Sequence, residues 1–425
     1  MSLANNRNSP VRFTDSWASV HFDLLRGLAA IFVLLGHWRN LFFVDFPDLV
    51  AHRHALLVPY LLTGAGHQSV VFFFVLSGYF IGGTVFRSIE RNQWEWRGYL
   101  LRRIVRLWMV LVPALLLCLF WDRLGIHLGH APALYGGHIP NHILPDVPPL
   151  LVPHVFFGNL FFLQNILTPV FGSDGALWSL ANEFWYYILF PLGVVALWPR
   201  ARVAHRLICA ALFVATAWFV RGGILVSFPI WLAGAALFKL PPPSFTPRTG
   251  RQLRIAALLI YLPVFFILGR LHTLSALVGD YLLTVLTFLL LWIFLSAKDR
   301  FAPEALSVRA SRELARFSYT LYAVHIPLLA FVVSLLAGDS RWYPTPAKVL
   351  TATGILLAVL FYAYALAFLT EFRTDALRYR LERLFGIVPA PPMLPSNPLS
   401  DGPTHRSNIA DPDAKIPAKI PTTAR

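Results

Sequence analysis

Long apolar segments separated by short polar ones dominate the 425-residue chain. Most of these segments approach the ~20 residues that an α-helix needs to cross a lipid bilayer. The pattern predicts an all-α integral membrane protein with about ten transmembrane helices; nine or eleven also fit, because two of the segments are short. The expected helices cover approximately residues 22–44, 68–86, 104–121, 178–198, 207–221, 223–239, 255–269, 277–296, 317–337 and 347–371.

The apolar run at 150–171, LLVPHVFFGNLFFLQNILTPVF, is the main ambiguity in this topology. Pro153, Gly158 and Pro169 interrupt it, and proline removes a backbone donor that a regular helix needs. We therefore expect an interfacial or re-entrant segment rather than a regular span. If this run crossed the membrane, the orientation of every later helix would invert.

Composition and charge support the membrane assignment. Hydrophobic residues make up 57% of the chain and charged residues only 13%, about half the charged share of a typical soluble domain. With ten alternating helices, 29 of the 36 Lys and Arg residues fall on the side of the N-terminus. By the positive-inside rule, both termini are then cytoplasmic. The net charge of +15 therefore reflects topology and anionic lipid, or an anionic cytoplasmic ligand, and indicates no nucleic-acid partner.

We expect one membrane domain with short tails. Residues 1–20 are polar and predicted to be a flexible cytoplasmic segment, and 21–371 form the membrane domain. Residues 372–388 interleave arginines with large apolar side chains, which is typical of a helix lying on the cytoplasmic membrane surface. Residues 389–425 contain nine prolines, so this tail is predicted to be disordered.

Two ionisable residues lie within the first apolar segment, in HFDLLRGLAAIFVLLGHWRN. Arg26 and His37 are eleven residues apart, which places them on nearly the same helix face and roughly 16 Å apart along it. Ionisable side chains within a membrane are costly and usually functional. His37 is suited to accept a proton from a hydroxyl, although a histidine can also serve as a packing contact between helices. Asp23 either holds the Arg26 guanidinium in place or forms a simple surface ion pair with it.

A second cluster, RRIVRLW, places Arg102, Arg103 and Arg106 on one broad face at the start of the third helix. Arginine binds phosphate through paired hydrogen bonds, so an anionic ligand is one interpretation. Ordinary membrane anchoring by the positive-inside rule is the other.

Glu183 lies in GALWSLANEFWYYILFPL, five residues after Trp178. A carboxylate that enters the membrane must be paired, hydrogen-bonded or protonated. It is a candidate partner for His37, where it would orient the imidazole and stabilise its charged form, or else a structural polar contact.

Three further polar side chains are candidate supporting residues. Tyr322 and His325 precede Pro327 in FSYTLYAVHIPLL, so His325 either lines the same cavity or satisfies the helix break at that proline. Ser77, in SVVFFFVLSGYFIGG, suits helix packing or a substrate contact. Eight histidines between positions 52 and 154 lie outside the expected helices without a zinc-ligand pattern, so we expect no metal site.

Together these runs resemble the membrane-bound acyltransferase family 3. The similarity is carried, in order, by FDLLRGLAAIFVLLGH, FFVLSGYFIGG, RRIVRLW, WSLANEFWYYILFP and FSYTLYAVHIP, and it covers residues 21–371. The family often has Ser or Val before the glutamate, where this chain has Asn182.

The resemblance implies a multi-pass enzyme of the bacterial inner membrane. Such an enzyme transfers an acyl group, often acetyl, from cytoplasmic acyl-CoA to a hydroxyl of a glycan, a lipid-linked saccharide or a related acceptor. It also implies that His37 is the catalytic histidine with Arg26 as its partner, that Arg103 and Arg106 are the paired arginines of the third helix, and that Glu183 is the carboxylate of the tryptophan motif. We further expect Glu183 to act in catalysis beside His37, and Arg26, Arg103 and Arg106 to bind the phosphates of acyl-CoA. Acyl-CoA would be the donor substrate, and no permanently bound cofactor is expected.

A proton-coupled transporter or exporter is one alternative, and a non-catalytic assembly partner of a polysaccharide complex is another. The transporter would use His37, Glu183 and His325 as a proton relay within the membrane and would need no acyl-CoA. The arginine cluster, which suits phosphate, favours the enzyme.

Overall fold

The computed structural model describes residues 13–139, 143–268, 275–299, 301 and 305–387. Within these ranges nine helical segments are long and apolar enough to cross a membrane, and one apolar helix of 17 residues adds a tenth. The ten are α1 (Trp17–Phe42), α3 (Gly66–Glu90), α4 (Trp96–Leu128), α7 (Trp178–Leu197), α8 (Val203–Val220), α9 (Gly223–Lys239), α10 (Pro247–Ile267), α11 (Ala276–Phe294), α13 (Ser318–Leu336) and α14 (Pro346–Ala367). The all-α membrane architecture is confirmed.

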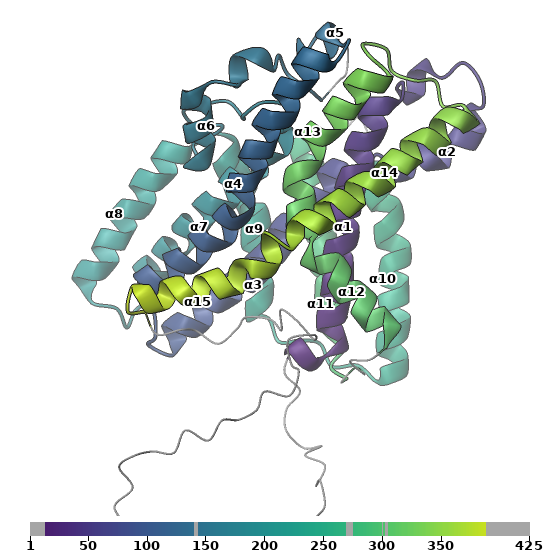
Figure 1. Ribbon diagram of the computed structural model, residues 1–425. Coiled ribbons are helices and arrows are strands. Elements are labelled where there is room, and N and C mark those ends of the chain that lie inside the picture. The colour runs from purple at the N-terminus through teal and green to yellow at the C-terminus, as the bar shows by residue number, and fades with distance from the viewer. Residues whose placement is uncertain (1–12, 140–142, 269–274, 300, 302–304, 388–425) are drawn as a thin grey trace, which may run out of the picture. The chain divides into compact units, whose positions relative to one another are not determined.

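The helices alternate in direction, so that α1 begins at the end of the bundle where α14 finishes (Figure 1). At this end Glu371, four residues after the last residue of α14, accepts hydrogen bonds from the backbone N–H and hydroxyl of Thr320 at the start of α13. At the opposite end the N–H of Trp342 donates to the Phe42 carbonyl. All ten expected segments are helices, as predicted, and the orientation of the bundle in the membrane stays a prediction.

The ends of several helices lie outside the apolar runs. α4 extends from Trp96 to Leu128, well beyond the expected 104–121, because the Glu95 side chain caps its start by accepting from the Gly98 N–H at 2.9 Å. A capped, charged first turn is stable in a helix but carries no hydropathy signal. The limits of an apolar run therefore understate a helix that projects past the hydrocarbon.

The segment 150–171 descends along α4 and returns. Its one helix, α6 (Pro153–Leu160), has eight residues and is too short to cross a bilayer. The Leu151 carbonyl accepts from Arg123, whereas the Leu160 carbonyl accepts from Trp108, fifteen residues earlier in α4. At 1.5 Å per residue this is a descent of ~22 Å.

The return is equally well defined. By Ser173 the chain is level with Asp122, whose carboxylate accepts from the Ser173 backbone N–H at 2.8 Å. At the tip, Phe162 stacks on Phe184 of α7 with ring centroids 4.3 Å apart. The segment is therefore re-entrant, and the two ends of the loop lie at the same end of the bundle, as the ten-helix topology requires.

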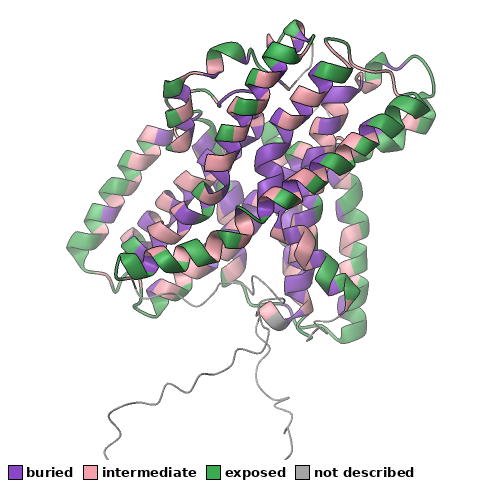
Figure 2. Cartoon of the chain, viewed as in Figure 1, coloured by how far each residue is buried: buried purple, intermediate pink, exposed green. Residues whose placement is uncertain are grey.

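The core lies where α1, α3 and α13 meet, and each of these helices buries twelve or more residues (Figure 2). The outer helices α8 and α10 expose most of their residues, as lipid-facing helices do. α3 and α9 approach so closely that a Cβ on Gly78 would overlap the Trp231 carbonyl oxygen and one on Gly234 would overlap that of Val75. Small residues permit such backbone contact between membrane helices.

Among the described residues, four α-helices were not predicted from the sequence: α2 (Arg53–Leu62), α5 (Pro132–Tyr135), α6 and α12 (Leu306–Arg316). α12 buries Val308, Ser311 and Ala315 against the bundle, a helical spacing within a charged sequence. The expected helix at 372–388 is present as η6 (Glu371–Arg373) and α15 (Thr374–Leu384), and its place on a membrane surface stays a prediction. The terminal segments expected at 1–20 and 389–425 lie outside the described residues, apart from 13–20.

Candidate active site

His37 and His325 are in direct contact at the centre of the candidate site. Nδ1 of His37, on α1, lies 2.7 Å from Nε2 of His325, on α13. The two rings are nearly parallel, with centroids 4.9 Å apart. His325 is fully buried and His37 is half-buried, so only the α1 imidazole keeps accessible surface.

The surrounding hydrogen bonds fix which nitrogens carry protons when both rings are neutral. Nδ1 of His325 lies 2.9 Å from the Leu321 carbonyl, which can only accept, so this nitrogen carries the hydrogen. Nε2 of His325 is then an acceptor, and Nδ1–H of His37 donates to it. The remaining nitrogen, Nε2 of His37, keeps its lone pair and is the basic atom of the pair.

His325 thus occupies the place beside His37 that the sequence suggested for Glu183. His325 also does not satisfy the break at Pro327. Its partner is the Leu321 carbonyl, whereas the carbonyl that a proline at 327 leaves free is that of Ala323. The hydrogen bonds of His325 therefore orient the two imidazoles and do not compensate for the backbone hydrogen bond that Pro327 removes.

Glu183 on α7 belongs to a separate polar cluster. Its Oε1 accepts a hydrogen bond from the Ser77 hydroxyl of α3 at 2.7 Å and another from the Tyr187 hydroxyl one turn along α7. Charge-assisted hydrogen bonds of this kind stabilise an ionised carboxylate. Glu183 is half-buried, so its second oxygen can reach a bound molecule.

The three arginines of the RRIVRLW run on α4 lie in different environments. Arg102 pairs with Glu382 of α15 at 3.0 Å. Arg103 is 3% exposed and lies over the rings of Tyr99 and Tyr187. Arg106 keeps exposed surface.

Arg106 connects this helix to the acidic groups around it. It lies close enough to Glu183 and Glu371 for their charges to interact. Of the α4 guanidinium groups, that of Arg106 is therefore the one that a ligand can reach beside Glu183. Arg103 instead supports the aromatic side chain that holds this carboxylate.

Arg26 connects α1 to the last turn of α12. Its Nη2 donates to the Ala315 carbonyl of α12 at 3.0 Å and lies 3.7 Å from the Asp23 carboxylate. The charge of Glu371 also reaches it. Arg26 and Arg106 therefore border one acidic residue, at the end of the bundle where α1 begins.

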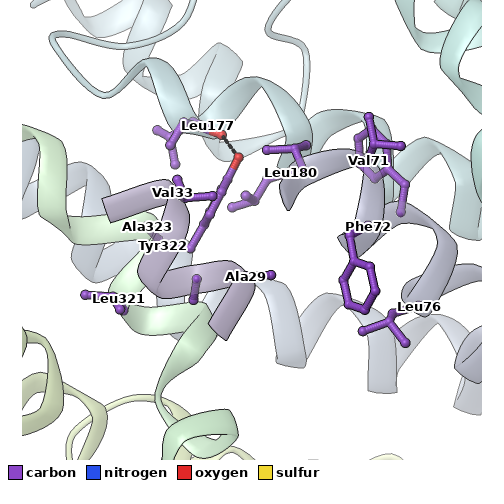
Figure 3. Packing of buried hydrophobic residues seen from close by; sticks show 14 of the residues in the cluster. Ala29, Val33, Val71, Phe72, Leu76, Leu177, Leu180, Leu321, Tyr322 and Ala323 are labelled. Carbon is purple, nitrogen blue, oxygen red and sulfur yellow. Dashed lines mark hydrogen bonds between the residues drawn. The ribbon is translucent and has the colours of Figure 1, made fainter. Parts of the chain in front are cut away.

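Tyr322 connects α13 to the start of α7. Its hydroxyl donates to the Ala176 carbonyl at 3.1 Å and lies 2.7 Å from the Ser179 hydroxyl. Figure 3 shows Tyr322 within the apolar core together with Val33 of α1. Trp178 packs edge-to-face on Phe74 of α3, at 5.9 Å. Both side chains fix helices around the histidine pair.

Two fully buried carboxyl groups, those of Asp122 and Asp174, lie next to the re-entrant segment. Asp122 accepts hydrogen bonds from the backbone N–H and hydroxyl of Ser173 and from the Cys118 thiol. Asp174, the residue after Ser173, carries the second buried carboxyl group. Burial and the nearby charge of Asp122 raise the pKa of Asp174 well above its usual range. This carboxyl therefore favours the protonated form.

The arrangement brings together an imidazole with a free ring nitrogen, a hydrogen-bonded carboxylate and accessible guanidinium groups. A family model for an acyltransferase domain matches residues 20–371. The chain belongs to acyltransferase family 3. No curated protein and no solved structure is significantly similar to it.

As a membrane acyltransferase, the chain contains functional candidates that its sequence did not reveal. Tyr187 is four residues after Glu183, a spacing at which side chains of one helix meet, and this signal was available. Glu371 is the first carboxylate after α14, four residues beyond its end. The contact between His37 and His325 joins positions 288 residues apart and has no local signal.

Proposed function

We propose that this acyltransferase moves an acyl group, in the first instance acetyl, from cytoplasmic acyl-CoA to a hydroxyl of a glycan or lipid-linked saccharide at the bacterial inner membrane. The observation that carries the proposal is the lone pair on Nε2 of His37, which the hydrogen bonds to His325 and Leu321 select. An acceptor hydroxyl needs a neutral base of this kind to become a nucleophile.

The proposed reaction uses this nitrogen twice. Nε2 of His37 takes the proton of the acceptor hydroxyl as its oxygen attacks the carbonyl carbon of the thioester. The C–S bond then breaks, the acyl group remains on the acceptor oxygen, and the CoA thiolate takes the proton back from Nε2. His325 is a positioning residue, because it acts on the substrate only through the Nδ1–H of His37.

Charged groups would bind the remainder of the two substrates. We assign Arg26 and Arg106 to the phosphates of CoA, with Arg106 as the more accessible of the two, and we place Arg103 in the same site as the buried support of the Tyr187 ring. Arginine is suited to phosphate through paired hydrogen bonds. His37 lies ~16 Å further along α1 than Arg26, a distance that an extended pantetheine arm can bridge. The free oxygen of Glu183 is placed to accept a hydrogen bond from a polar group of either substrate.

Membrane vesicles and radiolabelled acetyl-CoA test this proposal. Vesicles that contain the wild type should transfer label to an acid-stable, base-labile ester, and those with His37→Ala should not. His67→Ala is the matched control, because the His67 side chain is 52% exposed, pairs with Asp280 of α11 and should be dispensable for transfer. Equal labelling by wild type and His37→Ala would refute the assignment of the base.

A further inference from the structure

Ser77 behaves differently from the other Ser and Thr residues in the apolar part of α3. The hydroxyls of Ser69 and Thr84 donate to the carbonyls four residues earlier in their own helix, those of Ala65 and Phe80. This is the usual arrangement for Ser and Thr within a helix. Ser77 instead donates across the bundle to Glu183.

The indole of Trp231, on α9, explains the difference. Its Nε1–H donates to the Ser77 oxygen at 3.1 Å. A hydroxyl has one hydrogen to donate and two lone pairs to accept with, so Trp231 can bind Ser77 while Ser77 binds Glu183. Successive hydrogen bonds in such a chain polarise one another, which strengthens the last bond to the carboxylate.

Trp231 is itself held in place from two sides. The side chain is fully buried, and its ring packs against Phe190 and Phe228 at centroid distances of 5.0 and 6.2 Å. The backbone contacts at Gly78 and Gly234 fix the register of α9 against α3. The indole N–H therefore has a fixed position relative to Ser77.

We propose that Trp231 is a positioning residue of the acyltransferase, which holds the Ser77 hydroxyl toward Glu183 and thereby orients this carboxylate in the active site. Without the indole N–H, the Ser77 hydroxyl returns to the Phe73 carbonyl of its own helix, as Ser69 and Thr84 do with theirs. Loss of the Trp231 N–H then has the same effect on Glu183 as loss of the Ser77 hydroxyl.

The first readout is the infrared carboxylate band of Glu183, assigned by its absence in Glu183→Gln, with the purified full chain in lipid nanodiscs. Trp231→Phe, which removes the N–H and keeps an aromatic ring, should shift this band in the same direction as Ser77→Ala. Phe228→Leu disturbs the packing of the indole without removing the N–H and should leave the band in place. An unchanged band in Trp231→Phe would overturn the proposal.

The second readout rests on the proposed function and uses acetyl-CoA turnover. Trp231→Phe and Ser77→Ala should each lower kcat by about tenfold, the scale of one lost hydrogen bond to a charged group. The double variant should lose no more than either single variant. Multiplied losses would show that Trp231 acts independently of Ser77 and would refute the proposal. If the wild type did not turn over acetyl-CoA, the proposed function would fail, whereas the infrared comparison would still decide the role of Trp231.

Discussion

Replacement of His325 tests the histidine pair with two matched variants. His325→Leu removes the acceptor for Nδ1–H of His37 and fills the fully buried position with an apolar side chain. His325→Gln places an amide oxygen close to the former Nε2 and can still accept from His37. The two variants thus separate the hydrogen bond from the volume of the side chain.

The size of the effect follows from the tautomer. Without an acceptor at 2.7 Å, His37 is free to carry its hydrogen on Nε2, and a neutral ring in that form cannot take a proton from the acceptor hydroxyl there. General base catalysis contributes about 10²–10⁴-fold, so His325→Leu should lower kcat by up to that factor, or ~2.7–5.5 kcal/mol of activation free energy. His325→Gln should lose roughly tenfold, because it keeps the acceptor and loses the contact with the Leu321 carbonyl.

The assay is steady-state acetyl-CoA turnover by each variant in nanodiscs, with size-exclusion profiles to confirm equal amounts of folded protein. We expect KM for acetyl-CoA to stay near the wild-type value, since neither substitution touches the arginines. A His325→Leu enzyme that keeps more than half of the wild-type kcat would refute the reasoning. Equal losses in the Leu and Gln variants would show that volume, and not the hydrogen bond, matters.

Three other predictions concern stability and the site. Gly234→Ala should abolish the folded protein on size exclusion because its Cβ overlaps the Val75 carbonyl, whereas Gly354→Ala, with open space around it, should be neutral or stabilising; a folded Gly234→Ala would contradict the close contact. Because folding raises the pKa of Asp174, wild-type stability falls as pH rises above its unfolded pKa, so Asp174→Asn should show a flatter fall in melting temperature between about pH 5 and 8; parallel curves would contradict the buried, protonated carboxyl. Tyr187→Phe removes one donor to Glu183 and should lower kcat by about tenfold in the acetyl-CoA assay; an unchanged kcat would exclude a role for that hydrogen bond.

The helices could be predicted from the sequence because bilayer thickness fixes the length of an apolar run. The re-entrant character of 150–171 was also recognisable, since Pro153 and Pro169 interrupt its apolar pattern. Its depth was not recognisable, because the hydrogen bonds of its carbonyls with Trp108 and Arg123 of α4 define it. The polar ends of helices such as α4 could not be predicted either, because hydropathy does not detect them.

The site was only partly predictable for a similar reason. His37 and Glu183 stand out as ionisable groups within apolar runs, and hydropathy alone finds them. Their partners depend on the register of helices that are distant in sequence. His325 rather than Glu183 meets His37, and Ser77 meets Glu183, because of how α1, α3, α7 and α13 are packed. A spacing rule within one helix cannot supply such contacts.

Mass spectrometry of cell-surface glycans tests the central claim most directly. The comparison uses a deletion strain complemented with wild type, with His37→Ala or with His67→Ala, after each protein is shown to be present in the membrane. The account predicts an acyl ester with the wild type and with His67→Ala, and none with His37→Ala. The mass of the ester would also identify the acyl group and the acceptor. The same ester in cells that carry His37→Ala would contradict the claim that Nε2 of His37 is the base for acyl transfer.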